Sequence, residues 1–187
     1  MQALNTNQAG FQQTFDASDR FAEVFNALMR GKELCDCCTS QTETLLKSIS
    51  TDIESAYTKC EGQLDDLERH PEYSRHVIGT DGDWTALICR WEAGASSSVH
   101  GHPAFTFYYV LQGKFIMDLY KSKDGKSATL NDSRQLNRGD TLWDYGQEGR
   151  YDNLIHRVAA REHGYTLQLF SEDPALGQVF NRHQRLK

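Results

Sequence analysis

The chain has 187 residues, of which 39% are hydrophobic, enough to bury one core but too few for two domains of ordinary size. Its 26 acidic and 20 basic residues give a net charge of −6, so we expect no basic surface for nucleic acid or for an anionic membrane. No apolar run approaches the ~20 residues of a membrane span, and the first residues lack the basic and apolar regions of a secretion signal. We therefore expect a cytoplasmic, single-domain protein.

The first part of the chain, residues 1–72, has the pattern of a helical segment. Apolar side chains in residues 21–29 follow the i, i+3, i+4, i+7, i+8 spacing of an amphipathic helix that ends at Gly31. A second apolar stripe of the same period covers residues 45–57, and a third short helix is predicted around residues 64–67. We expect these helices to pack against the remainder of the chain, residues 73–187.

That remainder has the pattern of an antiparallel barrel or sandwich. Eleven of the 14 glycines and all three tryptophans fall after residue 78, and glycines recur every ~10–15 residues between short stretches rich in β-branched and aromatic side chains. The predicted strands are Trp84–Trp91, Phe105–Leu111, Lys114–Lys121, Ala128–Leu136, Asp140–Tyr145, Leu154–Ala159 and Tyr165–Ser171.

We do not expect the five cysteines to form a disulfide framework, because their number is odd and no secretion signal is recognised. The stretch 35–38 contains a C-x-x-C spacing, but a structural zinc site needs a second pair of ligands, and only the isolated Cys60 and Cys89 remain. We therefore expect reduced thiols that are buried or lie at helix ends.

Three histidines form the candidate metal site. His100 and His102 flank Gly101 just before a strong predicted strand, and alternation along a strand would point both imidazoles to one face. His156 lies on another predicted strand of the same barrel. Three neutral imidazoles that meet inside a barrel are suitable ligands for a divalent transition metal.

The residues around this pair resemble the first cupin motif, in which a glycine precedes H-x-H by six positions and a second glycine closes the motif. Gly94, His100, His102 and Gly113 match it, whereas Thr106 occupies the position at which most cupins carry a glutamate ligand. The second cupin motif is degenerate, with His156 as its ligand. The resemblance covers roughly residues 84–172 and implies an all-β cupin fold, a double-stranded β-helix or jelly-roll barrel, here with a helical N-terminal extension.

Among cupins, three histidines without the glutamate are typical of thiol dioxygenases, and the chain resembles the cysteine dioxygenase family most closely. The short sequence matches that support this resemblance lie before, within and after the first motif. They are Tyr73-Ser74-Arg75, Trp91, Ser97-Ser98-Val99-His100, Leu111-Gln112-Gly113 and His156-Arg157-Val158.

This resemblance implies an iron site and a substrate site. Fe(II) would be held by the three histidines and keep its full charge, so that a thiolate and O2 could bind beside it. Arg75 would form a bidentate pair with the carboxylate of a small thiol substrate, and Tyr73 would supply a hydroxyl beside it. The alternative for Arg75 is an ordinary surface arginine at the start of a strand.

The chain departs from the family on its last barrel strand. Thr166, Gln168 and Phe170 stand where the family has a Ser-x-His-x-Tyr relay, so neither the histidine nor the phenol is present. Thr106 also stands where animal members carry the cysteine that cross-links to that phenol. Tyr108 is in phase with the ligands, and we hypothesise that it lines the pocket and partly replaces the phenol, the alternative being an aromatic side chain of the core.

The leading hypothesis is an Fe(II) dioxygenase of cysteine metabolism that converts cysteine, or a related small thiol carboxylate, to its sulfinic acid. A three-histidine iron oxygenase acting on another thiol or on a non-thiol substrate is the second hypothesis. The third is a cupin that binds a metal or small ligand without turnover, or an isomerase using zinc or manganese. We expect a monomer whose partners are the small thiol and O2, with no nucleic acid or membrane.

Overall fold

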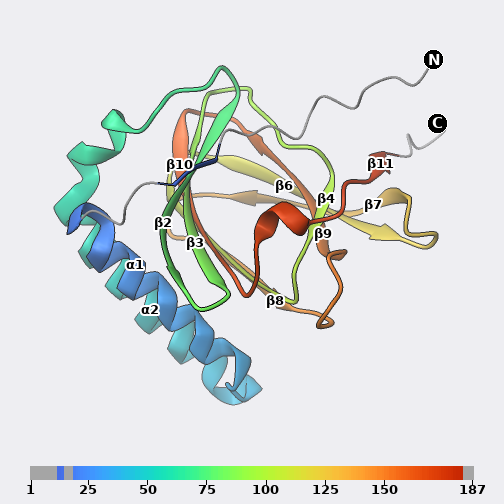
Figure 1. Cartoon of the computed structure of the whole chain (residues 1–187), viewed down its shortest axis with the longest axis horizontal. Coiled ribbons are helices and arrows are strands. Elements are labelled where there is room, and N and C mark those ends of the chain that lie inside the picture. The colour runs from blue at the N-terminus through green and yellow to red at the C-terminus, as the bar shows by residue number, and fades with distance from the viewer. Residues whose placement is uncertain (1–11, 15–18, 183–187) are drawn as a thin grey trace.

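The computed structural model describes residues 12–14 and 19–182, which form two facing β-sheets with a helical layer outside one of them (Figure 1). The first sheet has the strand order β1-β2-β3-β10-β5-β8 and the second β11-β7-β6-β9-β4. The helices are α1 (Ala22–Met29) and α2 (Thr39–Cys60), and the 3-10 turns are η1 (Asp19–Phe21), η2 (Arg30–Cys35), η3 (Glu61–Asp66) and η4 (Pro174–Leu176).

The strands pair antiparallel except at two short edges, where β1 pairs with β2 and β11 pairs with β7 in parallel. Their bounds are β1 Gln12–Thr14, β2 Tyr73–Asp81, β3 Trp84–Trp91, β4 His100–His102, β5 Phe105–Gln112, β6 Phe115–Ser122, β7 Ser127–Leu136, β8 Thr141–Tyr145, β9 Asn153–Ala160, β10 Gly164–Phe170 and β11 Asn181–Arg182. This arrangement is the cupin double-stranded β-helix, preceded by two helices, as the sequence predicted.

Strand β5 shows why the first sheet lies between two cores. Phe107 and Tyr109 on one face join a cluster with helix residues such as Leu28 and Ile53. Tyr108 and Val110 on the other face lie in the interior between the sheets. Both faces are therefore buried, which explains why β5 is a nearly continuous apolar run instead of an alternating one.

A polar network fixes helix α2 against the barrel. Glu54 of α2 accepts a hydrogen bond from the Tyr109 hydroxyl at 2.8 Å and forms an ion pair with Arg138 at 2.7 Å. The guanidinium carbon of Arg138 also lies 5.3 Å from the centroid of the Tyr57 ring, within the limit of about 6 Å for a cation–π contact. Helix α2 is thus positioned by directed contacts as well as by its apolar face.

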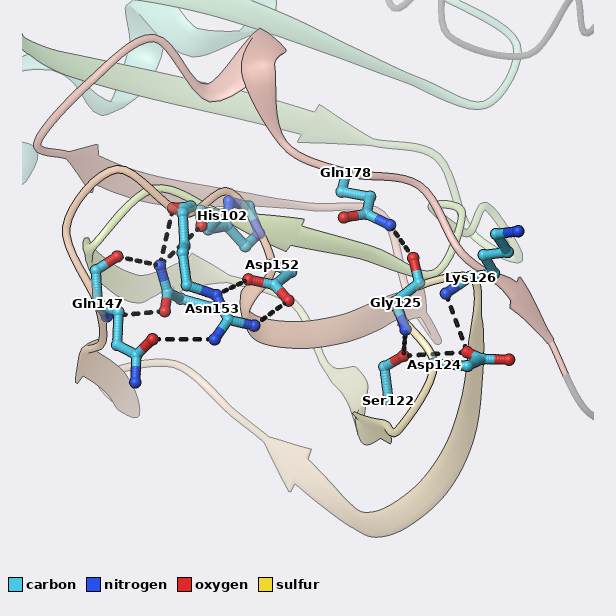
Figure 2. Close-up of polar contacts among 10 residues, drawn as sticks. His102, Ser122, Asp124, Gly125, Lys126, Gln147, Asp152, Asn153 and Gln178 are labelled. Carbon is cyan, nitrogen blue, oxygen red and sulfur yellow. Dashed lines mark hydrogen bonds and ion pairs between the residues drawn. The ribbon is translucent and has the colours of Figure 1, made fainter.

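The C-terminal residues 173–182, red in Figure 1, cross the end of the second sheet beside β4. The amide of Gly101 donates to the carbonyl of Gln178 at 2.8 Å, and the amide of Phe180 donates to the carbonyl of Val99 at 2.9 Å. In Figure 2 the Gln178 side chain also donates to the carbonyl of Gly125 in the β6–β7 hairpin. This segment therefore covers what would otherwise be the open edge of β4.

Several expectations from the sequence need correction. The third predicted helix is the 3-10 turn η3, and the segment expected to be helical also contains β1. Strands β2 and β4 were not predicted, because β2 mixes polar and apolar residues and β4 has only three residues. No helix within residues 12–14 and 19–182 is both long and apolar enough to cross a bilayer.

Candidate metal centre

His100, His102 and His156 converge at one point. Strands β4 and β9 are neighbours, and their register places His100 directly opposite His156. One potential ligand atom from each imidazole lies within 4.8 Å of those of the other two, and the ring centroids are 4.7 to 4.8 Å apart. The convergence that the sequence predicted is confirmed, and the cluster could hold a metal ion.

The protonation of the three rings suits metal binding. The Nδ1 of His100 donates to the carbonyl of Ser98 at 3.0 Å, which leaves its Nε2 lone pair free for an ion. Burial lowers the pKa of His100 to about 4 and, with neighbouring histidines as a further cause, lowers the pKa values of His102 and His156 well below their ordinary range. All three imidazoles are therefore neutral near pH 7, the form that ligates a metal.

His102 is the strongest evidence that the cluster accepts a ligand. The residue is 3% exposed, and neither ring nitrogen has a hydrogen-bond partner within the described part of the chain. Buried polar groups in folded proteins are almost always satisfied, so an unpaired buried imidazole beside two others indicates a missing partner. This set of three imidazoles fits a divalent transition metal such as iron, zinc, copper or nickel.

Backbone features that the sequence analysis missed hold β4 and β9 in place. A Cβ atom at Gly101 would lie 2.6 Å from the Cα of Asp152 and 2.7 Å from the carbonyl oxygen of Tyr151, so only glycine allows this approach. Leu154, two residues before His156, has a φ of 41°, which is uncommon for a bulky residue and typical of functional sites. Neither feature has a sequence motif that would have revealed it.

Asn153 ties the loop before β9 to the metal-ligand strand (Figure 2). Its side-chain nitrogen donates to the backbone carbonyls of His102 at 3.3 Å, Gln147 at 3.1 Å and Arg150 at 2.9 Å. Its side-chain oxygen accepts a hydrogen bond from the backbone N–H of Gln147 at 2.8 Å. One side chain thus connects the loop to the backbone of a potential ligand. Such supporting contacts orient ligands and stabilise the geometry of a metal site.

Two adjoining cavities lead to the histidines. The inner cavity, of about 20 Å³, is lined by all three histidines, and the outer cavity, of about 120 Å³, opens toward the C-terminal segment. Tyr73, Arg75, His100 and Pro174 line both. The two cavities therefore adjoin at these residues, and Pro174 places the C-terminal segment in the wall of both.

Arg75 and Tyr73 lie on the cavity face of β2. The Nε of Arg75 is buried without a hydrogen-bond partner, and no carboxylate of the described residues forms an ion pair with its guanidinium. Tyr73 stacks on Trp91 with ring centroids 4.6 Å apart, and burial raises the pKa of its hydroxyl despite the opposing charge of Arg75. Arg75 is half-buried in a cavity wall, in contrast to the surface arginine considered above.

The last barrel strand contributes two side chains to the inner cavity, Gln168 and Phe170. Phe170 stacks on the His102 ring, with centroids 5.0 Å apart and planes 11° from parallel. Thr166 is not among the lining residues, and its hydroxyl accepts a hydrogen bond from the Trp91 indole at 3.0 Å.

Tyr108 requires a correction. Its side chain faces the interior between the sheets, as its strand phase predicted, but it is not one of the residues that line either cavity. Gln168, its cross-strand partner on β10, lines the inner cavity instead. Tyr108 is 1% exposed, and burial raises the pKa of its hydroxyl, as expected for an aromatic residue of the core.

Cys89 is a cavity residue that the sequence analysis did not single out. It lies opposite Arg75 in the β2–β3 register and lines the inner cavity, where burial raises its pKa to about 12 and keeps the thiol protonated. All five cysteines are free, and Cys37 and Cys38 lie just before helix α2. Cys60 and Cys89 are buried, and Cys37 and Cys38 lie at a helix end, which matches the expected placement of the thiols.

Comparison with solved structures gives similarity in fold at low sequence identity. No family model and no curated sequence matches the chain. A solved structure of KdgF from a Halomonas species is 23% identical over 56% of this chain and 83% of its own, with a TM-score of 0.42. An uncharacterised double-stranded β-helix protein of Klebsiella pneumoniae is 14% identical over 63% and 88%, with a TM-score of 0.46. An oxalate oxidase in complex with glycolate is 19% identical over 56% and 54%, with a TM-score of 0.42.

The fold and the histidine cluster are both established by the structure. It contains the two facing sheets of a double-stranded β-helix, and three histidines from two adjacent strands converge between them. The cavity lined by these histidines is also lined by Arg75, whose Nε has no hydrogen-bond partner among the described residues. The chain has the cupin fold, with a three-histidine cluster that could hold a metal ion.

Proposed function

We propose that this protein is an Fe(II)-dependent thiol dioxygenase that converts cysteine, or a related small thiol carboxylate, to its sulfinic acid. The reaction is R–S⁻ + O2 → R–SO2⁻, in which the sulfur loses four electrons, both oxygen atoms bond to it and no further reductant is needed. The observation that carries the proposal is Arg75, which has no ion-pair partner among residues 12–14 and 19–182, in the same cavity as three histidines that have no carboxylate among them.

The ligand set supports the choice of an anionic substrate. Three neutral imidazoles leave a divalent ion its full charge, and a thiolate then neutralises part of that charge on binding. Thr106, in the position where most cupins carry a glutamate, is buried and contributes no negative charge. When bound, Fe(II) would supply adjacent coordination positions and the redox chemistry that joins a thiolate to O2.

The position of Arg75 supports a carboxylate at the other end of the substrate. Arg75 lines both cavities, so a small molecule that spans them lies beside it. A planar guanidinium pairs with a carboxylate through two parallel hydrogen bonds, which fixes orientation as well as position. The Tyr73 hydroxyl on the same face of β2 is available for a further hydrogen bond.

The inner cavity limits how much of the substrate can approach the histidines. Its volume of about 20 Å³ accommodates one or two groups of roughly the size of a water molecule. We therefore place the sulfur in the inner cavity and the carboxylate at the junction with the outer cavity. The aromatic face of Phe170 against His102 keeps that side of the inner cavity apolar and excludes water from it.

The test is O2 uptake by protein loaded anaerobically with Fe(II), using cysteine, 3-mercaptopropionate and cysteamine. We expect uptake with the two carboxylates, products that contain two additional oxygen atoms, and little turnover of cysteamine, which has no carboxylate for Arg75. Replacing Arg75 by methionine should lower kcat/KM for the carboxylate substrates about 10–100-fold, the effect of losing hydrogen bonds to a charged group.

A matched control is Arg134→Met, because Arg134 is exposed on β7 and distant in the topology from the cavity strands. This variant should retain the parent activity. Absence of uptake with all three thiols, by protein shown to contain one iron per chain, would contradict the proposal. Products other than sulfinates would instead indicate an oxygenase for a different substrate, and tight zinc without turnover would indicate a metal-binding cupin.

A further inference from the structure

One polar side chain of the inner cavity has no role in the proposed reaction. Gln168 is 8% exposed and lines the cavity with the three histidines and Arg75. Within the described part of the chain, its amide forms no hydrogen bond, in contrast to Thr166 on the same face of β10, which accepts one from Trp91. The Gln168 amide is not one of the fully buried polar groups that lack a partner, so it is open to the cavity and available to a molecule that enters it.

The sheet register places Gln168 across the cavity from Arg75. Arg75 pairs with Cys89, which pairs with Thr166, whereas Gln168 lies two residues further along β10 on the same face. Two strand spacings and one two-residue step separate the two Cα atoms by about 12 Å. Both side chains are long, so an amide and a guanidinium can contact opposite parts of one small molecule.

The chemistry of the cavity restricts what Gln168 can bind. An amide both donates and accepts hydrogen bonds but carries no charge. The residues that line the inner cavity include the cation Arg75 and no carboxylate, so an ammonium group there would have no counter-ion. A hydroxyl group also donates and accepts hydrogen bonds, so it matches the amide, and because it is uncharged it needs no counter-ion.

We propose that Gln168 determines specificity by binding a hydroxyl group on the carbon next to the substrate carboxylate, so that the preferred substrates are 2-hydroxy-3-mercapto acids. This inference rests on the proposed function and narrows its substrate class. Arg75 would bind the carboxylate, and the metal held by the histidine cluster would bind the sulfur. Gln168 would bind the hydroxyl group on the carbon next to the carboxylate. Cysteine, with an ammonium in that position, binds less well than the hydroxy acid.

The test compares 3-mercaptolactate with 3-mercaptopropionate, which differ only in the hydroxyl group. Dissociation constants are measured by calorimetry on the Fe(II) protein without O2, so that binding is separated from turnover. We expect the hydroxy acid to bind about 2–10-fold more tightly, the effect of one neutral hydrogen bond. Gln168→Met, which keeps the length of the side chain but removes the amide, should bring this ratio to about 1.

Two further variants exclude a merely structural effect. Gln135→Met makes the same replacement at an exposed position of β7 and should leave the ratio unchanged. Gln168→Glu provides a counter-ion for an ammonium and should reverse the preference, so that cysteine binds more tightly than 3-mercaptolactate. Circular dichroism and iron content show whether each variant is folded and loaded.

The outcomes distinguish this inference from the proposed function. The role of Gln168 would be overturned if the parent protein bound 3-mercaptolactate and 3-mercaptopropionate equally well. It would also be overturned if Gln168→Met kept the preference of the parent, even if thiols are oxidised. A ratio that depends on Gln168 without any O2 uptake would support the binding role while refuting the dioxygenase. Failure of Gln168→Glu to improve cysteine binding relative to 3-mercaptolactate would overturn the charge argument.

Discussion

The close approach of β4 to the loop before β9 provides a direct test of how the histidines are held. A methyl group at Gly101 would lie 2.6 Å from the Cα of Asp152, about 0.8 Å less than ordinary van der Waals contact. The neighbouring atoms belong to the backbone, so they cannot rotate away as a side chain could. Because Gly101 separates His100 from His102, Gly101→Ala should displace both imidazoles relative to His156.

The expected magnitudes follow from this overlap. Overpacking of a buried position costs about 1–3 kcal/mol in the free energy of unfolding. For a chain of this size, each kcal/mol lowers the melting temperature by about 2–4 °C, so we expect a decrease of roughly 2–12 °C. Displaced supports of metal ligands lower metal affinity about 10–100-fold, and we expect the same for iron in Gly101→Ala.

The assay combines thermal unfolding of the apoprotein with anaerobic competition for Fe(II) against a chelator of known affinity. Gly62→Ala is the matched control, because a Cβ atom there meets nothing within 4 Å. This control should retain the melting temperature and the iron affinity of the parent. If Gly101→Ala retains both as well, the contact between β4 and residues 151–152 does not position the ligands, and the reasoning is refuted.

Three further predictions test other parts of the structure. Gly177→Ala places a Cβ atom against the carbonyl of Gly101 from the C-terminal segment, and because that segment is less enclosed we expect a smaller loss of iron affinity than in Gly101→Ala, measured by the same competition. Tyr108→Phe should keep turnover within about twofold of the parent in O2 uptake, since Tyr108 does not line the cavities, and a larger loss would show that its hydroxyl acts in the reaction. Burial alone would raise the pKa of Glu54, but Arg138 and Tyr109 outweigh it and lower the pKa below the ordinary value of 4.5. A lowered folded pKa stabilises the protein above that value and the gain is lost as pH falls below it, so in urea unfolding Glu54→Gln should destabilise the protein at pH 7 and have less effect at pH 3.

The sequence by itself determined the layers of the fold. Helical and strand periods are local properties, so the stripes in residues 21–29 and 45–57 predicted two helices, and the β-rich stretches between glycines predicted most strands. The His100-Gly101-His102 pair was recognisable for the same reason, because two side chains in one short stretch share a face. The missed strand β2 carries polar residues toward the cavity, so the feature that makes it functional also obscured its pattern.

Only the tertiary structure decided which side chains share the cavity. Arg75 and Gln168 are far apart in the chain, and they come to face one cavity because β3 lies between β2 and β10 and the register aligns their rows. The alternation along β5 correctly predicted that Tyr108 faces the interior between the sheets. It could not predict where on that face the cavity lies, and Tyr108 does not line it. Local spacing determines the direction of a side chain, whereas strand order and register determine which other side chains it meets.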